Sequence, residues 1–394
     1  DGIRDVERSR GLGDVYKRQV RGHQQLYKLL EADGQVAEAV KVLEGYLTEV
    51  NPHHKRFRQE LVRLLLRHKE FDRALTELEF MMGQDPEDLN AQIRHALVFA
   101  ETKDTSRAIK EMSQIMDRNP SKVQVRDYLG LLYEQADQFE EAIQTYQFNI
   151  EVDPTFYDSQ IHLGYLFYRL KRYEEAVPHL RRSLELNPRG PESHLLLGLT
   201  YTQSQQHKMA VETFEQGLDR HPKNVDLRFN LGTVYDKLGR FPDVVREMEA
   251  VLELNPDHAD ALNYLGYSYA DRGMNIDEAV VLTQRAVALK PDNGYYIDSL
   301  GWALFKMGRI QEALVEIKRA AQLVKDDPVI FEHMGEIYLL QNARDKAKQA
   351  WLQSIGLDPR NGELQERFRE EGFGDPLEFM PGSPPKPRAI QYAE

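Results

Sequence analysis

The chain has 394 residues, of which 41% are apolar, and it carries a formal net charge of −13. A general binder of nucleic acid or of anionic membranes gains affinity from positive charge, so neither partner class is expected for this chain. The sequence contains no cysteine, which excludes disulfides, thiolate metal ligands and cysteine catalysis. It contains no run of eighteen apolar residues, and we therefore expect no membrane-spanning helix.

Residues 1–19 do not share the pattern of the rest of the chain. Their sequence, DGIRDVERSRGLGDVYKRQ, resembles translated adapter sequence from a sequencing library. We expect this segment to be a non-native N-terminal artefact, and it contributes nothing to the fold prediction. In that case the native N-terminus is missing, together with any signal peptide or lipid anchor that it encodes.

From residue 20 onward, proline recurs every 34 residues, at Pro52, Pro86, Pro120, Pro154, Pro188, Pro222 and Pro256. A constant period of this length is typical of repeat proteins. Proline lacks an amide hydrogen and restrains the residue before it, so it ends helices. Each proline therefore indicates the end of one repeat and a turn into the next.

A second mark follows the proline phase by ten residues, at Gly130, Gly164, Gly198, Gly232, Gly266, Gly301 and Gly335. Glycine inside a helix costs about 1 kcal/mol relative to alanine, so a recurring glycine needs a packing reason. Alanine follows twelve or thirteen residues later in most of these repeats, for example at Ala142 and Ala176. We expect each repeat to be a helical hairpin in which the glycine and the alanine allow the two backbones to approach closely.

These marks resemble the tetratricopeptide repeat over residues 21–361, in units that begin near residues 21, 55, 89, 123, 157, 191, 225, 259, 294 and 328. The resemblance is weaker over residues 20–122, three degenerate repeats in which Lys28, Val62 and Ala96 occupy the glycine position. It is strong over the seven repeats of residues 123–361. The resemblance implies an all-α, right-handed superhelical solenoid of antiparallel hairpins.

The C-terminal part differs in composition. Leu364 and Phe368 lie one helical turn apart, and we expect residues 362–371 to form a capping helix over the last hairpin. Residues 372–394 are rich in proline and glycine, and we expect them to form a flexible tail without packed structure.

We expect no catalytic residues, no metal site and no cofactor. The sequence has no phosphate-binding loop, no His-Glu-x-x-His motif and no Gly-x-Ser-x-Gly motif. The paired glutamates at the start of several second helices favour a solvated helix N-terminus over an acid–base pair.

The resemblance implies that the first helix of each hairpin lines a concave groove that holds a segment of another protein. The groove positions are Ile161, Tyr165, Tyr168, Leu195, Leu199, Phe229, Asn263, Tyr267, Asp298, Trp302 and Phe305. This stripe is more aromatic than a solvated helix face should be. The alternative is that its rings pack against the next hairpin. Arg56, Arg63 and Arg67 occupy the same face of an earlier repeat, where they form either a patch for an acidic partner segment or a solvated basic face.

We therefore interpret the chain as a non-enzymatic scaffold that binds a protein or peptide segment, with no nucleic acid and no direct membrane span. The alternative is a substrate-recruiting adaptor region of a larger enzyme, such as a glycosyltransferase, whose catalytic part is missing. The sequence allows an oligomer but does not require one. Residues 262–273 and 292–309 resemble repeat proteins of the bacterial cell envelope, so the compartment is either that envelope or the cytoplasm.

Overall fold

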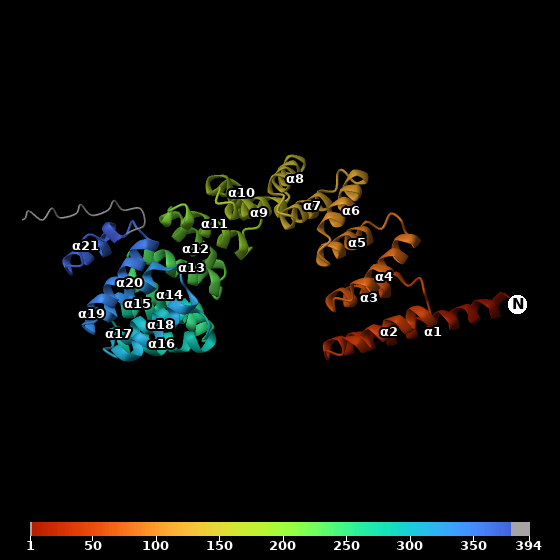
Figure 1. Ribbon diagram of the computed structural model, residues 1–394. Coiled ribbons are helices and arrows are strands. Elements are labelled where there is room, and N and C mark those ends of the chain that lie inside the picture. The colour runs from red at the N-terminus through yellow and green to blue at the C-terminus, as the bar shows by residue number, and fades with distance from the viewer. Residues whose placement is uncertain (1, 380–394) are drawn as a thin grey trace, which may run out of the picture. The chain divides into compact units, whose positions relative to one another are not determined.

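The computed structural model describes the backbone of residues 2–379 and the side chains of residues 17–379. The chain divides into two compact units, residues 1–188 and residues 189–394. Helices of the first unit form five antiparallel hairpins (Figure 1), whose helices are α1 (Gly2–Ala32), α2 (Val36–Glu49), α3 (Lys55–Arg67), α4 (Phe71–Gln84), α5 (Leu89–Glu101), α6 (Thr105–Arg118), α7 (Val123–Gln135), α8 (Phe139–Val152), α9 (Tyr157–Arg169) and α10 (Tyr173–Leu186).

The second unit continues the pattern with five more hairpins. Its helices are α11 (Pro191–Gln203), α12 (His207–Arg220), α13 (Val225–Lys237), α14 (Phe241–Leu254), α15 (Ala259–Asp271), α16 (Ile276–Leu289), α17 (Gly294–Lys306), α18 (Ile310–Leu323), α19 (Pro328–Leu340), α20 (Arg344–Leu357) and α21 (Gly362–Glu370), followed by the 3-10 helix η1 (Pro376–Phe379). The described residues contain no strand. The all-α class and the repeated hairpins predicted from the sequence are confirmed.

The recurring glycines lie where the two helices of a hairpin meet. A Cβ atom added to Gly164 would lie 2.6 Å from Leu180 Cγ, and one added to Gly301 would lie 2.7 Å from Ile317 Cδ1. The sequence analysis paired each glycine with the small alanine of the second helix. The nearest side chain is the one that follows this alanine by one turn. The backbone of the second helix is close as well, since the added Cβ would lie 3.3 Å from Leu180 N at Gly164 and 3.2 Å from Ile317 N at Gly301, so the glycine makes room for both.

Each hairpin turn contains a residue in the left-handed region of the backbone map. These residues are Gly34, Lys69, Lys103, Asp137, Lys171, Gln205, Gly239, Gly273, Gly308 and Asn342. The eighth turn has a second such residue, Asn275, because this turn is one residue longer than the others. A left-handed residue reverses the chain tightly, and glycine adopts this conformation without steric cost.

For the two ends of the chain, the sequence predicts a non-native artefact over residues 1–19 and a flexible tail over residues 372–394. Helix α1 begins at Gly2 and runs without a break into the first repeat. At the other end, the ring of Phe373 is buried, with its centroid 6.0 Å from that of Trp351 and 5.2 Å from that of Phe368. Phe373 and Pro376 are therefore packed against the end of the last hairpin, whereas Leu377 and Phe379 are exposed. The rest of the expected flexible tail, residues 380–394, lies outside the described residues.

Candidate protein-binding surface

Three of the predicted groove residues, Ile161, Tyr165 and Tyr168, lie on α9 of the first unit. Tyr165 is exposed, while Ile161 and Tyr168 are half-buried. The ring of Tyr168 lies 6.0 Å from that of Tyr173, and burial raises the pKa of its hydroxyl. The guanidinium of Arg169 lies 5.8 Å from the centre of the Tyr165 ring. Tyr165 is thus the ring of this group that remains most open to a partner.

The other predicted groove residues belong to the second unit. Leu195 and Leu199 on α11 are half-buried, and so is Phe229 on α13. The Phe229 ring lies 5.3 Å from the ring of His258 and 6.1 Å from that of Tyr264. Tyr264 lies on α15, the first helix of the next hairpin, and His258 is the residue just before that helix. Phe229 therefore contributes to packing between neighbouring repeats, which was the alternative for this stripe.

Trp302 on α17 is the centre of an aromatic stack. Its ring lies 4.0 Å from the ring of His333 with an interplanar angle of 13°, and 5.0 Å from that of Phe305 with an angle of 20°. The ammonium group of Lys306 lies 4.7 Å from the Trp302 ring. Only 8% of Trp302 is exposed, so most of this ring packs inside the array, while Phe305 is half-buried.

Polar groups fix the position of this stack. His333 Nδ1 lies 3.0 Å from both carboxylate oxygens of Asp298, one turn before Trp302 on α17. Tyr267 on α15 is half-buried with its ring 6.3 Å from that of His333, and burial, aided by the charges of Asp271 and Asp298, raises the pKa of its hydroxyl. Helices α15, α17 and α19 are neighbours in the fold (Figure 1).

Two buried polar atoms of this surface have no hydrogen-bond partner among the described residues. They are Nε1 of Trp302, a donor, and Oδ1 of Asn263, an acceptor on the neighbouring helix α15. Buried polar groups in folded proteins are nearly always hydrogen-bonded, and an unmade bond costs about 1–3 kcal/mol. We name the surface formed by Asn263, Tyr267, Trp302, Phe305 and Lys306 the α15–α17 face.

His333 was not among the groove residues predicted from the sequence, although it contacts three members of the candidate site. A signal for it was present. Asp298 and His333 are 35 residues apart, and the same spacing separates Asp127 and His162 in the first unit, where His162 Nδ1 lies 3.1 Å from Asp127 Oδ2. In two repeats, therefore, the aspartate three residues before the recurring glycine pairs with a histidine of the following repeat. That histidine lies two residues before the glycine of its own repeat.

The three arginines predicted as an acidic-partner patch are not equivalent. Arg63 lies 2.7 Å from Glu31 and 2.8 Å from Glu60, while Arg67 lies 2.6 Å from Glu31. The hydrogen bond from Arg63, outweighing the effect of burial, lowers the pKa of Glu31. Arg56 is exposed and has no ion pair among the described residues. Two of the three charges are therefore compensated inside the protein.

The Asp127–His162 pair has a consequence for stability that a matched histidine can test. Burial lowers the pKa of His162, but the hydrogen bond and charge of Asp127 outweigh it and raise the pKa. The resulting stabilisation is fully present below about pH 6.5, the unfolded pKa, and is lost as the pH rises through the raised folded value. We expect His162→Gln to remove this loss in thermal unfolding between pH 6 and 8.5.

His179 is a control, because its pKa is shifted in the opposite direction from that of His162. Burial lowers its pKa, and Gln160 Oε1 lies 2.9 Å from its Nδ1. Its stabilisation is present above about pH 6.5 and is lost as the pH falls through the lowered folded value. His179→Gln should therefore flatten the acid side of the stability profile. The same pH dependence in the parent and in His162→Gln would contradict the assignment.

Within residues 17–379, no group of three or more histidine, aspartate or glutamate side chains has the arrangement of a metal site. The helices of this described part are also too short or too polar to cross a membrane. The geometry defines a class of protein, an array of antiparallel helix hairpins.

Comparison with known proteins gives the family. A model described as TPR repeat matches residues 164–205, and one described as Tetratricopeptide repeat matches residues 30–97 and 201–265. The TPR repeat-containing protein PA4667 of Pseudomonas aeruginosa is 37% identical over 75 residues, which are 19% of this chain and 12% of that relative. The chain is a tetratricopeptide repeat protein.

Solved structures with a similar fold share little sequence with this chain. PilF of Pseudomonas aeruginosa has a TM-score of 0.47 and 20% identity, covering 54% of this chain and 97% of its own. The Cut9–Hcn1 hetero-tetramer of the APC/C has a TM-score of 0.43 and 16% identity, covering 84% of this chain and 58% of the matched one. MamA of Desulfovibrio magneticus RS-1 has a TM-score of 0.40 and 14% identity, covering 44% and 97%.

Proposed function

We propose that the protein is a non-enzymatic scaffold that holds a segment of a partner protein on the α15–α17 face. Tetratricopeptide repeats are protein-interaction modules and are generally non-catalytic. The partner segment would lie across the first helices of the eighth and ninth hairpins. Its apolar side chains would contact the half-buried rings of Tyr267 and Phe305, and Lys306 would favour an acidic group beside them.

The observation that carries this proposal is the pair of unpaired polar atoms on neighbouring helices. A peptide backbone offers both a carbonyl oxygen for Trp302 Nε1 and an amide hydrogen for Asn263 Oδ1. Trp302 is stacked between His333 and Phe305, so Phe305 would have to move for a partner to reach its Nε1. Tyrosine and tryptophan side chains dominate the energetics of protein interfaces, which supports this choice of surface.

A photocrosslinking experiment tests the location. The reactive amino acid p-benzoylphenylalanine replaces Phe305 in one variant and Val281, which is 53% exposed on the second helix α16, in the control. We expect a discrete protein adduct from position 305 and none from position 281. Adducts of equal yield at both positions, or none at 305, would place the partner elsewhere.

Truncation then measures the contribution of the face to affinity. With the crosslinked protein identified and purified, Tyr267→Ala should weaken its binding about tenfold or more, the size of effect typical of an interface hot spot. Val281→Ala, which removes an exposed side chain on α16, should leave the affinity unchanged. Isothermal titration calorimetry of the parent and the two variants, with unchanged helicity by circular dichroism, decides between these outcomes.

A further inference from the structure

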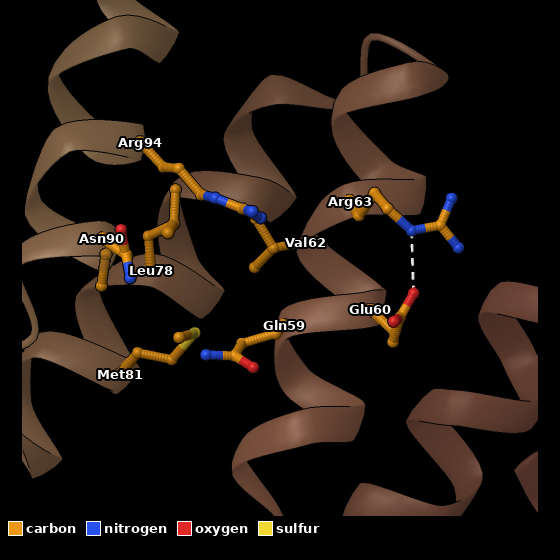
Figure 2. Close-up of a pocket in the computed structure, with 9 residues that line it drawn as sticks. Gln59, Glu60, Val62, Arg63, Leu78, Met81, Asn90 and Arg94 are labelled. Carbon is orange, nitrogen blue, oxygen red and sulfur yellow. Dashed lines mark hydrogen bonds and ion pairs between the residues drawn. The ribbon is translucent and has the colours of Figure 1, made fainter. Parts of the chain in front are cut away.

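The first unit contains a pocket of about 350 Å³ between α3, α4 and α5. Its lining includes Gln59, Val62, Leu78, Met81, Asn90 and Arg94. Figure 2 shows Arg94 extending across the opening toward Val62, while Gln59 and Met81 point toward each other below it. The volume is at the lower end of the range of about 300–1,000 Å³ that ligand pockets occupy, which is enough for one or two peptide side chains.

The pocket has a cause in the sequence. Val62 occupies the position at which later repeats have glycine, and its side chain is completely buried. Helices α3 and α4 pack less closely against each other than the helices of the other hairpins. Since glycine at this position makes room for the large residue of the second helix, valine keeps Leu78 and α4 farther from α3, and the space beside them stays open.

The pocket also lies at a position where two other repeats hold a pair of side chains in contact. Gln59 and Arg94 are 35 residues apart and occupy the positions of Asp127 and His162, which are in contact, and of Asp298 and His333, which are also in contact. The side chains of Gln59 and Arg94 form no hydrogen bond with each other or with any other described residue. An amide thus stands where two other repeats place a carboxylate, and Arg94 lacks the internal anion that the equivalent histidines have.

Other charges around the pocket do not supply that anion. Glu60, on the rim, lies 2.8 Å from Arg63, which also contacts Glu31. Arg63 also lines the pocket, and in Figure 2 its side chain contacts Glu60. Arg94 is exposed, and it therefore has a positive charge without an ion pair among the described residues, above an apolar floor formed by Val62, Leu78 and Met81.

We propose that this pocket binds a partner segment in which an acidic side chain stands next to a large apolar one. The carboxylate would accept hydrogen bonds from Arg94 and from the Gln59 amide, completing the pair that Asp127 and Asp298 make internally elsewhere. The apolar side chain would fill the space against Leu78 and Met81. The inference rests on the proposed partner-binding function, but it concerns a different surface and a different chemistry.

Three variants separate the pocket from its surroundings. Arg94→Gln removes the unpaired charge. Gln59→Glu introduces the carboxylate that Asp127 and Asp298 supply at the equivalent positions. This carboxylate should pair with Arg94 and replace the amide donor, so it should block the site with almost no change in side-chain size. Arg56→Gln removes the same charge from an exposed position of α3 that does not line the pocket, and it serves as the matched control.

The probe is a phage-displayed library of random nine-residue peptides, selected on the full chain and on each variant. We expect Asp or Glu beside Leu, Ile, Met or Phe to be enriched on the parent and on Arg56→Gln. By fluorescence anisotropy, a selected acidic peptide should bind Arg94→Gln and Gln59→Glu about tenfold more weakly than the parent. Circular dichroism of each variant verifies that the fold is retained.

Two results would overturn the proposal. One is a selection on the parent without enrichment of acidic residues. The other is a set of acidic peptides that bind Arg94→Gln and Gln59→Glu as tightly as the parent. If peptide binding is instead lost in Tyr267→Ala, the α15–α17 face is the site, and the partner-binding function stands while this pocket is excluded.

Discussion

Replacing Trp351 by alanine is expected to destabilise the last hairpin by about 3–5 kcal/mol, the usual cost of truncating a large buried aromatic residue. Trp351 is completely buried, and its Nε1 donates a hydrogen bond of 3.2 Å to the carbonyl oxygen of Glu332. Its ring lies directly over Gly335, and Phe373 packs against it from the C-terminal side. The substitution therefore leaves a cavity, removes one hydrogen bond to this carbonyl group and leaves an unsupported end cap.

Hydrogen exchange measured by mass spectrometry locates this effect. Exchange should accelerate in α19, α20 and α21 and remain unchanged in α13, which belongs to a distant hairpin, because repeats in such arrays stabilise mainly their neighbours. Trp351→Phe, which keeps most of the apolar volume, serves as the milder control. A loss of less than 1 kcal/mol in chemical denaturation of Trp351→Ala would show that the last hairpin does not depend on this ring.

The substitution Gly266→Ala should destabilise the eighth hairpin by about 1–3 kcal/mol through overpacking. The added methyl group would lie 2.7 Å from Thr283 Cγ2, 3.1 Å from the carbonyl oxygen of Ala279 and 3.1 Å from Leu282 Cβ. None of these atoms is the far end of a flexible side chain, so the two helices must separate. This cost exceeds the gain of about 1 kcal/mol that alanine brings to a helix interior.

Gly45→Ala is the matched control with the opposite sign. Gly45 lies inside α2, and a Cβ atom added there would have no neighbour within 4 Å. Only the helix propensity changes, so this substitution should stabilise the protein by up to about 1 kcal/mol. Thermal unfolding of the two variants beside the parent is the measurement. A stabilised Gly266→Ala variant would mean that the hairpin is not closely packed at this glycine.

Much of the fold was predictable because its cause is local. Proline position and glycine position together place the beginning of nearly every first helix, and the structure begins α3, α7, α13 and α19 at Lys55, Val123, Val225 and Pro328, as predicted. The packing partner of the glycine was not predictable from composition alone. Alanine and the large residue after it are one turn apart on the same helix, and only the rotation of that helix decides which of them meets the glycine.

The candidate site was less predictable. Periodicity indicates the helix face on which a residue lies, but it does not indicate which side chains of other helices cover that face. Trp302 is on the first-helix face as predicted, yet His333 of the next hairpin covers one side of its ring. Arg63 and Glu31 meet across two helices, which no spacing within one helix indicates. The pocket beside Arg94 arises from a departure from the pattern, Val62, whose effect on helix separation only the structure provides.

The left-handed residues in the hairpin turns determine where the chain tolerates a change in length. The eighth turn contains one extra residue and two left-handed positions, Gly273 and Asn275, yet α15 and α16 still form a closely packed hairpin. The insertion is absorbed at the edge of the array, and the register resumes at Gly301, 35 residues after Gly266. Inherited insertions, as well as an affinity tag or a fluorescent label, can therefore enter at these turns while each partner-facing helix keeps its alignment with its neighbours.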